Sequence, residues 1–352
     1  MIKVLLVRLL IVLPLSFSLF MPLTGVARAA SIDSQAWAAY KGAFLDPGGR
    51  ILDTGNGNIS HSEGQGYGMW LAVLADNMAD FELIWSFTRT ELLVRNDGLA
   101  AWKWDPNAKP HVSDINNATD GDILIAYALA LAAGQWDRLD YAQASAAIAS
   151  AILKNAVVQY GGKTLLLPAV SGFGADDRSD GPVVNPSYLI FEAFPVLNVV
   201  SPSPLWQGLT DEGLAQIDAF AFGPRNLPAD WVSVKTKPQP AKAFPAEFGY
   251  NAVRIPLYLV RAQQGSSALL ARLGKGMASD GGVAGTFDLK SGDAKDVLAD
   301  PGYRIIVGLA ECAASGNPVA EDMKNFKPTL YYPSTLHLLA LSYLSTKNGA
   351  CR

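Results

Sequence analysis

The chain has 352 residues, of which 50% are hydrophobic, 17% are charged and 10% are aromatic. This composition is typical of a globular protein with a large buried core and excludes an intrinsically disordered one. The 28 basic and 32 acidic residues leave a formal net charge of -4, and no run of Lys or Arg is long enough to follow a phosphate backbone. We therefore expect no nucleic-acid partner.

The first 29 residues have the features of a secretory signal peptide. Two basic residues precede an apolar stretch from Leu9 to Leu23, and the small side chains of Ala27 and Ala29 meet the requirement of signal peptidase. An uncleaved anchor is the alternative, but two prolines and the short apolar length argue against a membrane span. We predict cleavage after Ala29, a periplasmic or secreted protein that does not insert in a membrane, and one mature domain over residues 30–352.

Helix-like patterns recur along the whole mature chain, whereas strand-like alternation is scarce. Eleven segments are predicted as helices, and a twelfth is expected to begin near Ala320. The eleven segments are Ser34–Phe44, Ser62–Asp80, Phe81–Leu93, Asp120–Gly134, Tyr141–Tyr160, Pro186–Val200, Thr210–Phe222, Ala246–Gln264, Ser266–Met277, Pro301–Ala314 and Pro333–Thr346. No low-complexity linker divides them, so the pattern indicates a single all-α domain.

The segment from Ile123 to Ala133 is apolar on every side. A soluble protein tolerates such a helix only where other elements surround it. Two helical layers follow, with inner helices wrapped by outer ones. About twelve helices in two layers favour an α/α barrel.

The motif Ser62–Trp70 opens one of the predicted helices. A serine followed three residues later by a glutamine predicts a capping box, which places Glu63 in the first helical turn. Three alternate glycines each cost the helix about 1 kcal/mol relative to alanine, so the absence of their side chains must be needed. Either a ligand lies against the helix end beside Glu63, or the glycines allow close helix packing and Glu63 only complements the helix dipole.

A second motif, at residues 118–122, opens the apolar helix and contains two aspartates. Residues two apart on a helix face different ways, so one of Asp120 and Asp122 is expected to point into a central cavity while the other caps or pairs locally. The helix N-terminus favours the ionised form of a carboxylate. Two capping aspartates without a catalytic role are the alternative.

Several aromatic side chains stand beside polar ones, a combination that suits sugar binding because flat rings stack on sugar faces. Ordinary core packing is the alternative for any single ring. These aromatic residues are Trp102, Trp104, Tyr188, Trp231, Tyr331 and Tyr332.

Taken together, four motifs in this order resemble glycoside hydrolase family 8. They are Ser62–Trp70, the Ala-Thr-Asp-Gly-Asp segment at 118–122, Asn185–Leu189 and Gly249–Arg254. The similarity spans about residues 34 to 345, nearly the whole mature chain. The chain resembles in particular the secreted endoglucanases encoded with bacterial cellulose synthases.

The resemblance implies an (α/α)6 barrel that hydrolyses β-1,4-glucans with inversion at the anomeric carbon. Inversion needs a general acid and a base whose carboxyl groups lie ~6.5–9.5 Å apart. By resemblance, Glu63 is the proton donor and Asp120 holds the distorted sugar at the cleavage point. The glucan-binding residues that it implies are Trp102 or Trp104, Tyr188, Tyr250, Arg254 and Tyr332.

The sequence departs from the family pattern at one catalytic position. An aspartate serves as the base in the well-described endoglucanases, but here that position is Asn251. A carboxamide does not accept a proton at ordinary pH. The candidate substitutes are Asp176 and Asp177 in a glycine-rich loop, together with Asp120 and Glu247.

We therefore expect an endo-β-1,4-glucanase that trims nascent cellulose, with the cellulose-synthase machinery as a candidate partner. A glucan-binding accessory with weak or no hydrolysis, and a chitosanase or xylanase of the same family, are the alternatives. Three histidines without paired spacing predict no metal site, and no phosphate-binding loop is present, so no cofactor is expected. Cys312 and Cys351 are either bonded to each other or free thiols.

Overall fold

The computed structural model describes residues 30–279, 282–346 and 351, and in these ranges it contains eleven α-helices. The helices are α1 (Ser34–Phe44), α2 (Ser62–Leu74), α3 (Met78–Phe87), α4 (Thr119–Trp136), α5 (Leu139–Asn155), α6 (Ala193–Val200), α7 (Pro204–Ala219), α8 (Ile255–Arg261), α9 (Ser267–Met277), α10 (Pro301–Ser315) and α11 (Tyr331–Thr346). A π-helical turn (Thr88–Leu92) follows α3.

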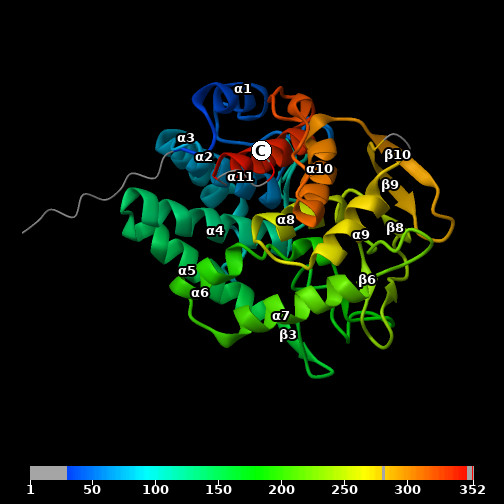
Figure 1. The fold of residues 1–352 in the computed structure, drawn as a ribbon. Coiled ribbons are helices and arrows are strands. Elements are labelled where there is room, and N and C mark those ends of the chain that lie inside the picture. The colour runs from blue at the N-terminus through cyan, green and yellow to red at the C-terminus, as the bar shows by residue number, and fades with distance from the viewer. Residues whose placement is uncertain (1–29, 280–281, 347–350, 352) are drawn as a thin grey trace, which may run out of the picture.

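The helices lie in two layers, as the apolar pattern predicts (Figure 1). Most residues of α2, α8 and α11 are buried, and α4 is buried without interruption from Thr119 to Leu129. Helices α1, α5 and α7 bury only one face and lie outside them. The inner ring forms because α2 packs on α4 and α11, α4 on α6, and α10 on both α8 and α11.

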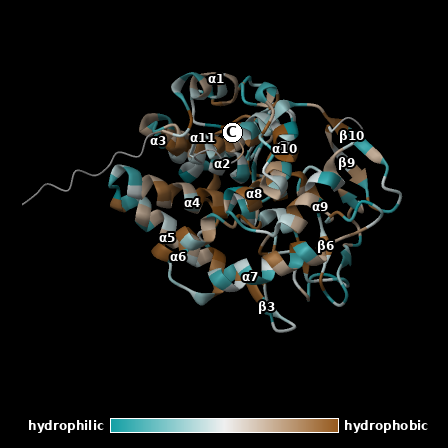
Figure 2. Cartoon of the chain, in the orientation of Figure 1, coloured by the Kyte–Doolittle hydropathy of each residue, from teal (hydrophilic) through white to brown (hydrophobic). Residues whose placement is uncertain are grey.

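Figure 2 shows hydrophobic residues recurring along α4, α8 and α10. The all-round apolar sequence of α4 thus has a structural reason, since other helices contact it on several sides: α2, α5 and α6 all pack against it.

Ten strands of two to five residues connect the helices in this part of the chain. They form four small antiparallel sheets, of order β1-β2, β3-β4, β5-β6-β7 and β10-β9-β8. The strands are β1 (Ser60–His61), β2 (Lys103–Trp104), β3 (Val157–Tyr160), β4 (Lys163–Leu166), β5 (Val183–Val184), β6 (Val232–Ser233), β7 (Gln239–Pro240), β8 (Glu247–Phe248), β9 (Ala284–Asp288) and β10 (Ala294–Leu298).

Two of the predicted helices are wrong over part of their length. The helix predicted over Tyr141–Tyr160 ends at Asn155, because β-branched valines and a Gly-Gly turn favour the β3-β4 hairpin there. The helix predicted over Ala246–Gln264 begins only at Ile255, after β8 and a 3₁₀ turn (Ala252–Arg254).

Other predicted boundaries shift as well, and the helix predicted from Pro186 begins only at Ala193. The segment Ser62–Asp80 is divided between α2 and α3, because Asp76 adopts a left-handed conformation with φ 51°. Pro186–Tyr188 is a 3₁₀ turn that precedes α6, and the twelfth helix expected near Ala320 is a single 3₁₀ turn, Glu321–Met323.

Cys312 and Cys351 form a disulfide that joins α10 to the C-terminal end of the chain. The sequence left open whether these cysteines are bonded. Closing a loop of 39 residues stabilises the folded state by about 4 kcal/mol in the chain-entropy model. Within the described ranges, no helix has both the length and the hydropathy to cross a membrane.

Candidate active site

Helix α2 begins with a histidine cap and not with the predicted capping box. The Nδ1 atom of His61 accepts a hydrogen bond from Gly64 N at 2.9 Å. The side chain of Gln65 instead accepts from Ile51 N and donates to the carbonyl of Gly49. The capping-box prediction is therefore wrong, although Glu63 does lie in the first turn, as predicted.

Close packing of α2 against α4 explains the glycines of the first motif. A Cβ atom on Gly66 would lie 2.5 Å from the Cβ of Leu124, so only glycine allows the two helices to approach this closely. The packing interpretation therefore holds for Gly66. The same approach places the first turns of α2 and α4 side by side, which brings Glu63 and Asp120 together.

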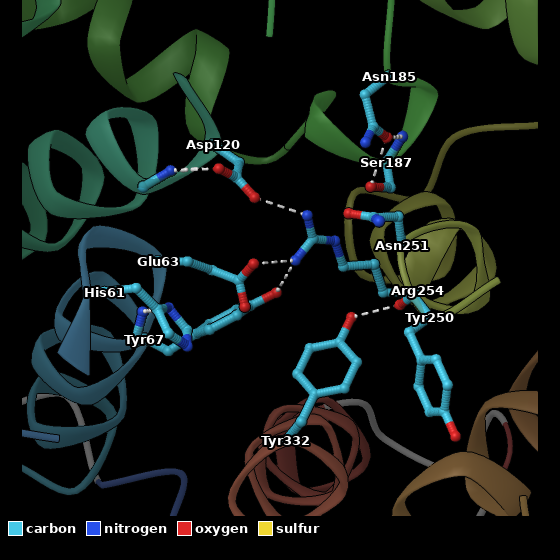
Figure 3. A network of polar contacts seen from close by, with 12 residues as sticks. His61, Glu63, Tyr67, Asp120, Asn185, Ser187, Tyr250, Asn251, Arg254 and Tyr332 are labelled. Carbon is cyan, nitrogen blue, oxygen red and sulfur yellow. Dashed lines mark hydrogen bonds and ion pairs between the residues drawn. The ribbon is translucent and has the colours of Figure 1, made fainter. Parts of the chain in front are cut away.

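One guanidinium joins the two carboxylates that the motifs predict. Arg254 Nη1 donates to Glu63 Oε2 at 2.8 Å, and Arg254 Nη2 donates to Asp120 Oδ2 at 2.7 Å (Figure 3). Arg254 is 1% exposed, whereas the Glu63 side chain is 19% exposed. Glu63 is thus the member of this cluster that remains accessible from the cavity.

The two carboxyl groups hold a proton between them near neutral pH. Burial raises the pKa of Asp120 to about 7, with repulsion from Glu63 adding to the rise and Arg254 opposing it. Burial also raises the pKa of Glu63, but attraction to Arg254 and His61 outweighs it, so the net pKa is lowered. Because both side chains accept a hydrogen bond from the same guanidinium, a proton on one carboxyl group lies beside the other.

Asp122 has the local role predicted for one of the two aspartates. Its Oδ1 accepts from Ala100 N at 2.8 Å and its Oδ2 from Asn117 Nδ2 at 2.9 Å. The expectation that the helix N-terminus keeps these carboxylates ionised is wrong, because burial raises the pKa of Asp122, like that of Asp120, to about 7. Desolvation outweighs the helix dipole here.

An open cavity of about 460 Å³ lies over Glu63 and Arg254. Its lining residues come from the segment between α1 and α2, the start of α2, the loop before α8, and the N-terminal ends of α10 and α11. The residues are Asp53, Gly55, Asn56, His61, Glu63, Tyr250, Asn251, Arg254, Tyr303, Leu330, Tyr331, Tyr332 and Pro333. Tyr332 donates a hydrogen bond to the carbonyl of Tyr250 at 3.0 Å, so two predicted sugar-binding residues meet at its rim (Figure 3).

Three further predicted binding residues, Trp102, Trp104 and Tyr188, lie outside the lining of the cavity. Tyr188 is 9% exposed, and the Arg254 guanidinium lies 5.6 Å from the centre of its ring. Trp102 and Trp104 lie at β2, which pairs with β1 just before Glu63. The ring of Trp104 stacks on His111 with centroids 4.2 Å apart, so one face of this ring is covered by a side chain of the protein itself.

Of the four candidate substitute bases, Asp120 belongs to the cluster on Arg254, whereas Asp176, Asp177 and Glu247 lie apart from the cavity. Asp177 Oδ2 accepts from the backbone N–H groups of Gly172 and Gly174, which fixes its own glycine-rich loop. Asp176 is exposed and does not line the cavity. Glu247 forms an ion pair with Lys295.

Two features of the site were missed from the sequence. His61 Nε2 lies 3.4 Å from the Asp53 carboxylate, which lines the same cavity wall as Glu63. Behind Asn251 lies the buried carboxylate of Asp230, which accepts a hydrogen bond from Asn251 Nδ2 at 3.2 Å. A lone aspartate in the apolar segment Asn226–Val234 was the only sequence signal for Asp230, since a buried carboxylate needs partners.

Comparison with known proteins places this arrangement in a family. The model of glycosyl hydrolases family 8 matches residues 16–345. The chain belongs to this family. As a family 8 chain, it has the (α/α)6 barrel that the family resemblance implies.

Similar proteins of family 8 carry endoglucanase names. An endoglucanase of Cellulomonas uda is 41% identical, and the match covers 67% of this chain and 65% of that protein. A probable endoglucanase of Novacetimonas hansenii is 35% identical over 87% of this chain and 89% of its own. The crystal structure of endoglucanase Cel10 from Klebsiella pneumoniae has a TM-score of 0.79 and 35% identity, and covers 89% of this chain and 100% of that one.

Proposed function

We propose that this family 8 chain is an endo-β-1,4-glucanase that hydrolyses cellulose with inversion. The observation that carries the proposal is the pair of Glu63 and Asp120 on one buried guanidinium at the floor of an open cavity. The endo-β-1,4-glucanase CMCax from Acetobacter xylinum, which is 32% identical with a TM-score of 0.79, supports the same substrate class.

Glu63 acts as the general acid in this proposal. It is the exposed carboxyl of the pair, so it reaches the glycosidic oxygen, while Asp120 stores the proton and holds the sugar at the cleavage point. As the glycosidic bond breaks, the proton that the pair holds passes to the leaving oxygen through Glu63, and solvent then reprotonates the pair. Arg254 stabilises the carboxylate charge that remains.

The sugar chain binds along the aromatic wall of the cavity. Tyr250 is 48% exposed, and its ring lies 6.3 Å from that of Tyr303, which in turn lies 6.1 Å from Tyr332. This row of tyrosines gives both ring faces and hydroxyl groups to a glucan.

Endo-cleavage has a direct assay. On a soluble cellulose derivative we expect viscosity to fall steeply while few reducing ends have formed, because an endo-acting enzyme cuts inside the chain. Equal production of reducing ends at nearly constant viscosity would indicate an exo-acting enzyme.

The replacement of the family's aspartate by Asn251 favours one other function. A chain with this carboxamide in its cavity could bind glucan and cut it weakly or not at all. Binding of cellulose oligomers without detectable reducing ends, at enzyme concentrations up to those of the substrate, would support that glucan-binding accessory role.

The protein is further proposed to act outside the cytoplasm, on cellulose that a cellulose synthase has just extruded. The Cys312–Cys351 disulfide supports this location, because disulfides persist in oxidising compartments. The predicted signal peptide, residues 1–29, lies outside the described residues. Intact mass of the exported protein is expected to fit a chain that begins at Ala30 with both cysteines oxidised. A mass that retains Met1 would show an anchor instead.

A further inference from the structure

The buried carboxylate of Asp230 lies at the centre of a cradle of N–H groups. Asp230 is 4% exposed, and its Oδ1 accepts from Gly249 N and Ala252 N at 2.8 and 2.9 Å. Its Oδ2 accepts from the backbone N and the side-chain Nδ2 of Asn251 at 3.3 and 3.2 Å. A Cβ on Gly249 would lie 2.5 Å from Oδ2, so this approach requires glycine.

These contacts determine which way the Asn251 amide faces. An ionised carboxylate only accepts hydrogen bonds, so Asn251 presents Nδ2 to Asp230 and turns Oδ1 the other way. Figure 3 shows the Asn251 oxygen pointing toward the network around Arg254, and Asn251 lines the cavity. Among the residues of the described ranges, none donates a hydrogen bond to this oxygen, which leaves it available to water in the cavity.

Asn251 also lies on the side of the site that inversion requires. The attacking water of an inverting glycosidase approaches the sugar from the face opposite the general acid. Glu63 and His61 come from the start of α2, whereas Asn251 comes from the loop before α8, beyond the Arg254 guanidinium (Figure 3). Asp53 contacts His61, so it belongs to the wall of the acid.

We propose that Asn251 holds the attacking water through Oδ1, and that Asp230 is the positioning residue that fixes Asn251 for this task. The inference rests on the proposed hydrolytic function. The water oxygen bonds to the anomeric carbon while the bond from that carbon to the glycosidic oxygen breaks. The glycosidic oxygen takes the proton of Glu63, the surplus proton of the water passes to solvent in the open cavity, and Glu63 is reprotonated from solvent.

Asp230→Asn tests the positioning role. An amide at position 230 turns its NH2 group toward at least one of the four converging N–H donors, so Asn251 loses its fixed orientation. We expect kcat on cellopentaose to fall ~10²-fold, as for a misplaced reacting group. KM should change by less than about threefold, because Asp230 does not contact the sugar.

Asp122→Asn is the matched control. Asp122 is also buried, and it accepts one backbone N–H and the Nδ2 of an asparagine, but that asparagine, Asn117, does not line the cavity. The Asp122→Asn variant should lose stability, as the Asp230→Asn variant does. Once the folded fraction is measured by circular dichroism, its kcat should stay within about threefold of the unsubstituted protein.

A pH profile separates positioning from a purely structural role. Asn251→Asp places a carboxylate where it can take the water's proton, but beside Asp230, whose charge raises the pKa of the new group. Asp230→Asn in the same chain removes that repulsion, so the acidic limb of kcat/KM should move to lower pH in the double variant. The other charged groups around the cavity, Asp53, His61, Glu63 and Arg254, are the same in both variants, as are Tyr188 and Tyr250.

The outcomes distinguish this inference from the proposed function. If Glu63→Gln is inactive while Asp230→Asn keeps its kcat, or if the acidic limb is the same in the single and double Asn251→Asp variants, the function stands and the positioning role is wrong. If the unsubstituted protein does not cleave cellopentaose, both are contradicted. A selective loss of kcat together with the shifted limb supports the inference.

Discussion

Replacing Glu63 with glutamine is expected to lower kcat on cellulose oligomers by at least ~10²–10⁴-fold. The amide keeps the size of the side chain and its hydrogen bond to Arg254, but it has no proton to give to the leaving oxygen. Oligomer affinity, measured by calorimetry, should therefore remain close to that of the unsubstituted protein.

Glu192→Gln is the control for this experiment. Glu192 also pairs with an arginine, Arg261, at 2.6 Å, but it does not line the cavity. Its variant should keep kcat in the folded protein. Near-normal activity of Glu63→Gln would remove Glu63 from the role of general acid.

Arg254→Met is expected to destabilise the fold by about 3–5 kcal/mol at pH 7.5, because two buried carboxyl groups lose their cation. Activity should be lost as well, since the guanidinium holds both groups in place. Urea unfolding measures the first effect. Arg261→Met, which removes another buried guanidinium from a single carboxylate, should destabilise the protein but leave kcat of the folded fraction intact.

The stability loss in Arg254→Met should depend on pH. Burial already raises the pKa of Asp120 to about 7, and without the guanidinium it rises further above its unfolded value near 4. A group whose pKa is higher in the folded state stabilises the fold below its unfolded pKa and loses that contribution as pH rises through the folded pKa. The difference in stability between the variant and the unsubstituted protein should thus be smallest below about pH 6 and should grow as the pH rises through 7. A difference that stays constant between about pH 6 and 8.5 would contradict this assignment.

Local sequence patterns predicted the parts of the site that depend on one helix at a time. The apolar run of α4 predicted a buried helix, and the first turns of α2 and α4 carry Glu63 and Asp120 where the motifs placed them. Predictions from local sequence failed where a residue distant in the sequence determines the contacts of a side chain. The side chain of Gln65 hydrogen-bonds to the backbone of Ile51 and Gly49, so no capping box forms.

The contacts that complete the site join residues far apart in the sequence. Arg254 meets Glu63 across 191 residues and Asp120 across 134, and no periodicity encodes those distances. Asp230 lies 21 residues before Asn251, and only the folded loop brings its carboxylate behind the amide. The family resemblance supplied Arg254, but Asp230 needed the structure.

The stereochemistry of the first product distinguishes inversion from retention. When a β-1,4-glucan is cleaved inside an NMR tube, we expect the α-anomer of the new reducing end to appear first and the β-anomer to form only by mutarotation. An initial β-anomer would mean retention through a covalent intermediate. Retention would need two carboxylates only ~5–5.5 Å apart, one of them a nucleophile, and would contradict water attack from the side of Asn251.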